Sequence, residues 1–325
     1  MRIFAKVPNI NFMAQRKTGL LVSSVLSIVS ILLLVFHGLN LGIDFTGGVI
    51  VQASYPQTVQ LDSVRDALKK GGYENSIVQS FGTSSDVLIR LPAAKDSNTA
   101  ETSSKIMSAL GAIQGCKAED RASKVCVNKV DFVGPQVGEE LTEQGGLAMA
   151  VAFGLIMLYI AFRFEKKFSV GAIAALMHDA LMVLGFLSAT GVEFDLTTLA
   201  AILALIGYSN NETIVIFDRV RENLINLRKM QILDVVNLSV NQTLLRSVIT
   251  HLTTLLVSTA LLILGGASVH SFSIAMIVGV IVATYSSIYI STGIVVALGI
   301  SREDLLPPKD DEMEAAKKKH GGAVV

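Results

Sequence analysis

Six long apolar stretches constrain the fold of this chain more than any other feature. Each has about 20 residues, which is the length that an α-helix needs to cross the hydrocarbon core of a membrane. Only 17% of the chain is charged, against about a quarter in soluble domains, and the mean hydropathy is +0.56. The sequence therefore predicts a polytopic α-helical membrane protein with six transmembrane helices. The six stretches are residues 18–36, 145–162, 170–189, 196–217, 247–264 and 272–300.

Lysine and arginine in the short loops indicate the orientation of the chain, because they are enriched on the cytoplasmic side. They gather before the first stretch, between the second and third, and between the fourth and fifth, whereas the connections 190–195 and 265–271 contain neither. We therefore expect both termini in the cytoplasm and a long exterior segment after the first helix. The expected division is a cytoplasmic N-terminus (1–17), a first transmembrane helix (18–37), an exterior domain (38–142), a bundle of five further helices (143–300) and a disordered cytoplasmic tail (301–325).

The first stretch does not have the pattern of a cleaved signal peptide. Its apolar run of 19 residues is longer than the usual h-region, and the residues that follow lack a small-x-small cleavage site. We expect an uncleaved membrane anchor.

The exterior segment has the element order of a small α+β domain. Strand patterns cover residues 49–55, 76–81, 86–91 and 124–132, and helical spacing covers 58–71 and 98–113, the latter with Ile106, Leu110 and Ile113 on one face. This β-α-β-β-α-β order predicts a ferredoxin-like domain between the first two transmembrane helices. The segment has no paired carboxylates and no nucleophile beside a base, so its pattern favours a binding or mechanical role over catalysis.

Both cysteines of the chain, Cys116 and Cys126, fall in this exterior segment. In an oxidising periplasm they could form a disulfide across a hairpin-like loop. Two unpaired thiols are the alternative, and the sequence leaves both open. No cluster of cysteine and histidine indicates a metal site.

Glu212 places a carboxylate inside the fourth apolar stretch. An ionised side chain in hydrocarbon is costly by a few kcal/mol or more, so such residues usually face a bundle interior and mark an ion or proton path. The surrounding part of the stretch is unusually polar. Arg246 directly precedes the fifth stretch on the same side of the membrane, so the two could meet at similar depth. A structural ion pair between helices is the alternative to a proton relay. The polar neighbours of the carboxylate are Tyr208, Ser209, Asn211 and Thr213.

Two further sets of polar residues lie in the apolar stretches. His178 and Asp179 in the third stretch are candidates for a second relay station, with hydrogen bonding between helices as the equally weighted alternative. His251 is a candidate for the interface near Arg246.

Several other residues are expected to act structurally. Asp195 is expected to cap the N-terminus of the fourth helix, and Asp44 to shape the junction between the first helix and the exterior domain. Gly171 and Ala175 are expected to permit close packing of the third helix.

Motifs spread over nearly the whole chain resemble the SecF family of the bacterial SecDF protein-export complex. The most specific are Gly-Ile-Asp-Phe-Thr-Gly-Gly at 42–48, Val-Gly-Pro-Gln-Val-Gly-Glu-Glu at 133–140 and Gly-Tyr-Ser-Asn-Asn-Glu-Thr within 206–223. Shorter agreements occur at 178–179, 193–196, 243–246 and 284–287. The resemblance is weakest in the exterior domain and the C-terminal tail.

The resemblance implies a role in protein transport by the Sec pathway. The family belongs to the resistance-nodulation-division (RND) superfamily, whose members usually carry two six-helix halves, so it implies SecD as the partner half. It further implies the SecYEG channel, YajC, translocating unfolded preproteins and membrane lipids as partners, and no nucleic acid. It places the chain in the bacterial inner membrane with a periplasmic domain, where the proton-motive force drives late stages of export without a cofactor. The resemblance implies no enzymatic activity.

The resemblance also assigns roles to two residues. In the family, proton flow involves an acidic residue of the fourth helix and an arginine near the start of the fifth, and these positions match Glu212 and Arg246. The family usually has Asp where this chain has Glu212. The proton-carrying carboxylate is therefore retained with one more methylene.

Two other functions remain as alternatives. The chain contains no Walker A, dinucleotide-binding or His-Glu-x-x-His motif, so an ATP-driven pump or a membrane metalloprotease is not predicted. The first alternative is half of an RND exporter for small molecules or lipids, which would predict a larger exterior domain. The second is a scaffold without ion coupling, for which Glu212 and Arg246 would be replaceable.

Overall fold

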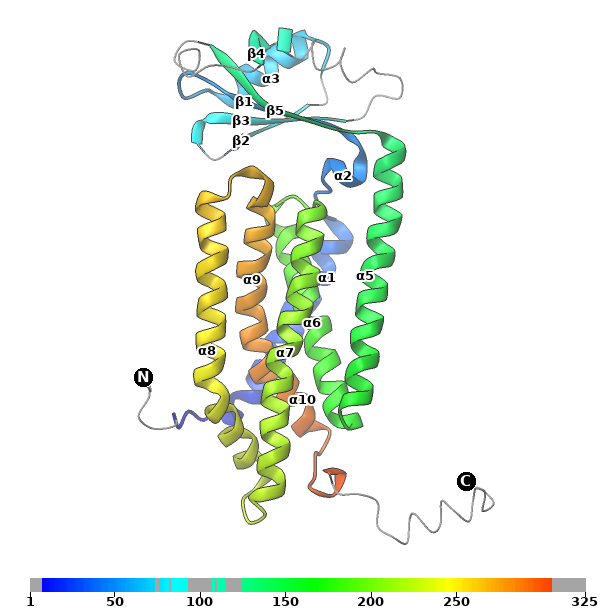
Figure 1. Ribbon diagram of the computed structural model, residues 1–325, viewed down its shortest axis with the longest axis vertical. Coiled ribbons are helices and arrows are strands. Elements are labelled where there is room, and N and C mark those ends of the chain that lie inside the picture. The colour runs from blue at the N-terminus through cyan, green and yellow to red at the C-terminus, as the bar shows by residue number, and fades with distance from the viewer. Residues whose placement is uncertain are drawn as a thin grey trace, which may run out of the picture.

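A computed structural model describes residues 8–73, 76–81, 83–92, 107–108, 110–114 and 124–305. In this part of the chain six helical segments are long and apolar enough to cross a membrane, which confirms the predicted number. They stand side by side, with a β-sheet domain at one end of the bundle (Figure 1). The segments are α1 (Arg16–Phe36), α5 (Pro135–Arg163), α6 (Lys166–Thr190), α7 (Leu196–Asn226), α8 (Ile232–Leu264) and the run of α9 (His270–Ser286), a π-helical turn (Ser287–Ser291) and α10 (Thr292–Ala297).

The centre of the bundle is formed by α6, α7 and the α9–α10 segment. About half of the most apolar window is buried in each of these three, against 17% or less in α1, α5 and α8. Phe168 and Phe217 are fully buried and pack edge to face with ring centroids 4.9 Å apart. The three peripheral helices therefore present most of their apolar surface outward, as helices in contact with lipid or with another subunit do.

Three helices extend beyond the apolar stretches that predicted them. Helix α5 begins at Pro135, α7 continues to Asn226, and α8 begins at Ile232. The added turns contain polar residues such as Asp218, Asn223 and Asn237. An apolar window locates the part of a helix that crosses a membrane, but not the polar turns that project beyond it.

The domain at the end of the bundle contains one five-stranded sheet. Its order is β2 (Ile77–Phe81), β3 (Thr83–Pro92), β1 (Gly48–Ser54), β5 (Val125–Val133) and β4 (Ala112–Gln114). The first four strands pair antiparallel, with Val51 opposite Ile89 and Val130, and β4 joins β5 in parallel. Helix α3 (Leu61–Lys70) contributes Val64 and Leu68 to the core of this domain.

The predicted strands at 49–55, 76–81, 86–91 and 124–132 and the predicted first helix are confirmed. The prediction of a helix over residues 98–113 is wrong at its C-terminal end. Ala112 and Ile113 belong to β4, where Ile113 lies opposite Cys126, because pairing with the edge of β5 satisfies their backbone groups. Most of the predicted helix, including Ile106, lies outside the described residues. Cys116 also lies outside them, so the bridge to Cys126 stays a prediction.

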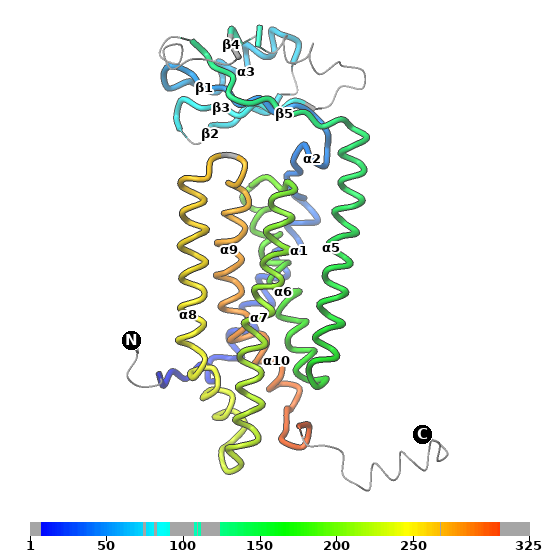
Figure 2. The backbone as a smooth tube through the Cα atoms, viewed as in Figure 1, coloured from blue at the N-terminus to red at the C-terminus, as the bar shows by residue number. Residues whose placement is uncertain are grey.

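A short connector, residues 37–47, joins α1 to the sheet. The chain passes from α1 through α2 (Ile43–Thr46) into β1 and returns from β5 into α5 (Figure 2). Gly47 follows α2 with φ of 67°, a conformation that favours glycine. A Cβ on Gly138 of α5 would lie 2.8 Å from the Gly47 nitrogen, so the close approach of the two backbones requires glycine at position 138.

The connector is also tied to the loop between α6 and α7. The Gly42 amide donates to the Phe194 carbonyl at 2.8 Å, and the rings of Phe45 and Phe194 stack with centroids 5.5 Å apart. The Asp44 carboxylate accepts a hydrogen bond from the Leu196 amide at 2.9 Å, at the first turn of α7. The expected role of Asp44 at the junction is thus visible as a contact between the connector and the start of α7.

Candidate functional site

Glu212 lies within α7 and is only 5% exposed. The Ser247 hydroxyl of α8 donates a hydrogen bond to Glu212 Oε1. On the other side of the carboxyl group, Oε2 lies 3.8 Å from Nε2 of His251, which is also on α8. The carboxyl group is therefore enclosed by side chains of the neighbouring helix instead of facing lipid.

Helical spacing brings these groups together. Ser209, Glu212 and Ile216 recur at intervals of three and four residues on the buried face of α7, and Ser247 and His251 recur four residues apart on the buried face of α8. This stripe meets both neighbouring helices, since Ser247 contacts Glu212 of α7 and His251 contacts Thr284 of α9.

His251 connects the carboxyl group to α9. Its Nδ1 lies 2.9 Å from the Thr284 hydroxyl oxygen, and its ring centroid is 5.5 Å from that of Tyr208. The imidazole is 4% exposed. We name the four side chains that are joined by hydrogen bonds or by the close contact of the carboxyl and imidazole groups the Glu212 cluster. It consists of Glu212, Ser247, His251 and Thr284.

Arg246 does not join this cluster by direct contact. It lies inside α8, well after the start of that helix at Ile232, and its side chain is exposed. Among the described residues, its guanidinium group makes neither a hydrogen bond nor an ion pair. The sequence predicted that Glu212 and Arg246 would meet. In the structure the carboxyl group is instead hydrogen-bonded by Ser247, the residue that follows Arg246.

Asp179 is the centre of a second buried cluster. It accepts hydrogen bonds from Ser209 of α7 at 2.5 Å and from Ser286 of α9 at 2.8 Å, and His178 Nδ1 lies 3.1 Å from its other oxygen. We name His178, Asp179, Ser209 and Ser286 the Asp179 cluster. It links the three central helices α6, α7 and α9, which favours hydrogen bonding between helices as its role.

The remaining predicted residues lie apart from the carboxyl groups. Asn211 is exposed on α7, whereas Thr213 is buried on the same helix. Sequence reasoning did not single out Ser247 or Ser286. The four-residue spacing of Ser247 and His251 was a signal for Ser247, but only the packing of α9 against α6 reveals the contact between Ser286 and Asp179.

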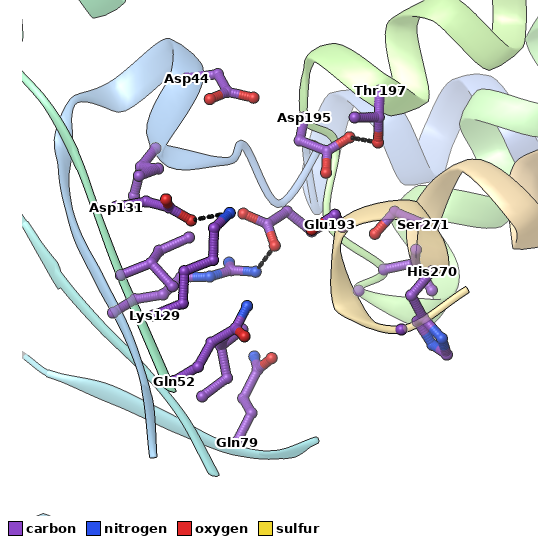
Figure 3. A pocket seen from close by; sticks show the side chains of 18 of the residues that line it. Asp44, Gln52, Gln79, Lys129, Asp131, Glu193, Asp195, Thr197, His270 and Ser271 are labelled. Atoms are coloured by element: carbon purple, nitrogen blue, oxygen red, sulfur yellow. Dashed lines mark hydrogen bonds and ion pairs between the residues drawn. The ribbon is translucent and has the colours of Figure 1, made fainter. Parts of the chain in front are cut away.

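A cavity of about 890 Å³ separates the sheet from the ends of the helices (Figure 3). Arg90 of β3 and Glu193 of the α6–α7 loop form an ion pair beside it, with side chains 9% and 14% exposed. Burial lowers the pKa of the Arg90 guanidinium, and the charge of Asp195 opposes this change. The Asp195 side chain accepts from the Thr198 amide at 2.7 Å and caps α7, as expected.

Within the described residues, no group of three or more His, Cys, Asp or Glu side chains is arranged to hold a metal ion. The chemistry that the Glu212 cluster can perform with its own groups is to hold a proton and pass it on, since it contains one carboxyl group, one imidazole and two hydroxyl groups.

Comparisons with known proteins identify the family. Residues 115–301 match the C-terminal region of the protein export membrane proteins SecD and SecF, and residues 32–59 match the SecD/SecF GG motif. The protein translocase subunit SecF of Pseudomonas aeruginosa is 46% identical over 94% of this chain and 96% of its own length. The chain belongs to the SecF family. The SecF subunit of Haemophilus influenzae is 39% identical over 94% of this chain and 91% of its own length.

The fold is also that of a solved relative. The crystal structure of SecDF from Thermus thermophilus, described as a translocon-associated membrane protein, matches with a TM-score of 0.78 and 36% identity over 91% of this chain. This chain spans only 39% of that SecDF chain. Membership of the SecF family, together with the six apolar helices, makes this chain a multi-pass membrane protein.

Proposed function

We propose that this chain is a subunit of an accessory complex of the Sec translocon and uses the proton-motive force to promote late stages of protein export. The names of its SecF relatives and the description of SecDF as translocon-associated support the export role. The proton coupling rests on the site itself.

The observation that carries the proposal is the position of Glu212. A carboxyl group at 5% exposure within a membrane-spanning helix is costly to ionise unless a partner stabilises the charge. Its hydrogen bond to Ser247 and the nearby imidazole of His251 can stabilise either protonation state as the helices shift. A group in such surroundings can accept a proton in one arrangement and release it in another.

The available energy suits a ratchet better than a single strong pull. Each proton that crosses about 100 mV releases about 2.3 kcal/mol, which shifts a two-state equilibrium roughly 50-fold. This is enough to bias a motion of the domain outside the membrane. Export of a long polypeptide then requires many protons.

A SecD half is the proposed partner of this chain. Four residues on α7, Ala200, Ala204, Gly207 and Asn211, are exposed at helical spacing although α7 is a central helix. Small residues permit close approach of a further helix in a membrane. Arg246 is exposed as well, and it is free to pair with an acidic group of the partner. SecYEG, YajC and the translocating preprotein are the further partners in this proposal.

The proposal places the chain in the inner membrane with both termini in the cytoplasm and the sheet domain in the periplasm. We infer a ferredoxin-like fold for this domain, because the order β2-β3-β1-β5 with antiparallel pairing and the helix α3 after β1 agree with that pattern. We also infer that the chain is not an enzyme but a transport subunit.

The test is translocation of a preprotein into inverted membrane vesicles, with and without a proton-motive force. Glu212→Gln removes the proton-carrying group but keeps its size, and Glu212→Asp keeps the carboxyl group as a matched control. We expect Glu212→Gln to assemble with SecD and to lose the force-dependent late stage, whereas Glu212→Asp retains at least part of it. Unchanged late-stage translocation in Glu212→Gln would make the residue structural and favour a scaffold.

A further inference from the structure

We propose that His251 is the residue with which Glu212 exchanges its proton, so that the two form a carboxyl–imidazole relay between α7 and α8. This inference rests on the proposed proton coupling and adds a second proton-carrying group to it.

The imidazole of His251 is buried, and only one of its two nitrogen atoms has a hydrogen-bond partner in the described part of the chain. Its Nε2 atom has no hydrogen-bond partner among the described residues, and the nearest carboxyl oxygen is Glu212 Oε2 at 3.8 Å. A buried polar atom without a partner is unfavourable, because it has lost its hydrogen bonds to water and gained none in the protein. The location of this unpaired nitrogen next to the carboxyl group is explained if Nε2 receives a proton during the transport cycle.

The hydrogen bonds around Thr284 determine which nitrogen carries the proton in the neutral ring. The Thr284 hydroxyl group donates its hydrogen to the Val280 carbonyl at 2.7 Å. Its oxygen can therefore only accept from His251 Nδ1, which lies 2.9 Å away. Nδ1 then carries the hydrogen of the neutral ring, and Nε2 presents its lone pair to Glu212.

The carboxyl group is held in the complementary arrangement. Ser247 engages Oε1, which leaves Oε2 for His251. In the transfer, the O–H bond at Glu212 Oε2 breaks and an N–H bond forms at His251 Nε2, giving a carboxylate and an imidazolium. The two atoms must approach by about 1 Å to reach hydrogen-bonding distance. A small movement of α8 against α7 therefore opens or closes the relay.

Among the described residues, few other ionisable groups face this pair. Tyr208 of α7 lies beside the imidazole ring, Arg246 of α8 carries a positive charge that acts on Glu212, and α9 contributes the uncharged Thr284. Asp179 is engaged by its own cluster. The exchange can thus be followed with Glu212 and His251 as the main titrating groups.

The first test is solid-state NMR of the chain with its SecD partner in lipid bilayers, with histidine labelled with nitrogen-15. The chain has five histidines, and the His251 signals are assigned by their loss in His251→Asn. We expect the neutral ring to carry its hydrogen on Nδ1, and Thr284→Val to abolish this preference. A neutral His251 with its hydrogen on Nε2 would overturn the proposal.

The second test is the coupling of the two titrations. In Glu212→Gln we expect the midpoint of the His251 titration to move by at least about one pH unit, which corresponds to a tenfold change in its proton affinity. His178→Asn is the matched control, because it removes the other buried histidine without touching the Glu212 cluster. An unchanged His251 titration in Glu212→Gln would also overturn the proposal.

The transport assay separates this inference from the proposed function. His251→Asn keeps a donor for Thr284 but lacks the acceptor that faces Glu212, so we expect it to lose the force-dependent stage as Glu212→Gln does. If only Glu212→Gln loses that stage, the proton coupling stands and the relay through His251 fails. If Glu212→Gln retains it, the proposed function fails, and the NMR experiments alone decide whether the pair exchanges a proton.

Discussion

At the residue scale, the length of the acidic side chain matters because its contacts lie on another helix. Glu212 reaches Ser247 and approaches His251 across the boundary between α7 and α8. An aspartate here would be one methylene shorter, so its carboxyl group would lie farther from both residues and weaken these contacts. The longer side chain of glutamate is therefore the one that places the carboxyl group beside both Ser247 and the imidazole of His251.

Ser247 should contribute to the stability of the assembled chain. In Ser247→Ala the carboxyl group of Glu212 loses its hydrogen bond while it remains buried, so we expect a loss of about 1–3 kcal/mol. The thermal unfolding midpoint of the complex in detergent measures this effect. Thr253→Ala is the control, because Thr253 is exposed and its hydroxyl donates to the Thr250 carbonyl of its own helix. Equal midpoints for the two variants would contradict the assigned role.

The segment after α10 should respond to strong acid. Burial by itself would raise the pKa of Asp304, but hydrogen bonds from Lys167 and Ser301 and the charge of Lys167 outweigh it and lower the pKa below its ordinary value of 3.8. The resulting stabilisation is present above the unfolded-state value and is lost as the pH falls through the lowered value. The protection of residues 299–305 against hydrogen exchange, measured relative to the intrinsic exchange rate at each pH, should therefore fall in strong acid.

Asp304→Asn provides the matched comparison for this pH effect. It should show faster exchange already at neutral pH, by an amount that corresponds to about 1 kcal/mol. Exchange that is equally slow in the variant and in the parent would show that the contact with Lys167 does not hold the segment.

At the element scale, small residues set how closely the central helices approach one another. A Cβ at Gly171 would lie 2.7 Å from the Ser291 carbonyl oxygen and from a Val295 methyl group, so α6 packs directly on the π-helical turn and α10. Gly171→Ala should cost about 1–3 kcal/mol through overpacking. Gly154→Ala on α5 is the control, because nothing lies within 4 Å of its added Cβ. Thermal unfolding of the two variants side by side checks this prediction.

The elements themselves could largely be predicted from the sequence. Apolar length identified all six membrane helices, and strand-forming residues together with a turn-rich segment identified the four antiparallel strands. The helix ends at Pro135, Asn226 and Ile232 could not be predicted from hydropathy, because polar turns carry no apolar signal. β4 was missed because a three-residue strand gains its stability from pairing with β5 and has no pattern of its own.

The candidate site was predictable only in part, because it depends on the rotation of each helix. A lone carboxylate in an apolar stretch indicated Glu212, and spacing along one helix indicated its polar face. The partner residues lie on other helices, so their choice depends on the register of α7, α8 and α9. This register placed Ser247 and His251, and not Arg246, in contact with the carboxyl group.

At the scale of the whole molecule, the α6–α7 loop ties the sheet domain to the bundle through contacts among the described residues. The Arg90–Glu193 pair connects β3 directly to the α6–α7 loop. This loop leads into α7, the helix that contains Glu212. A change in the packing of α7 can therefore reach the sheet through this loop and through the connector that carries Asp44.

Loss of the Arg90–Glu193 pair should loosen the sheet domain. Arg90→Met leaves the Glu193 carboxylate buried without its partner, so we expect destabilisation of about 3 kcal/mol at this contact. The double variant Arg90→Met with Glu193→Gln should lose less, because no unpaired charge remains. Distances between spin labels on α3 and α8 should broaden in the single variant, and an unchanged distribution there would contradict a tether.

The proposed function depends on Glu212 taking up and releasing a proton during transport. The most direct measurement is infrared difference spectroscopy of the complex in lipid after a pH jump, with the carboxyl band of Glu212 identified by its loss in Glu212→Gln. We expect a band that appears and disappears as the pH changes, with a pH dependence that His251→Asn alters and His178→Asn does not. A Glu212 carboxyl group that stays in one protonation state throughout would contradict the proposed function.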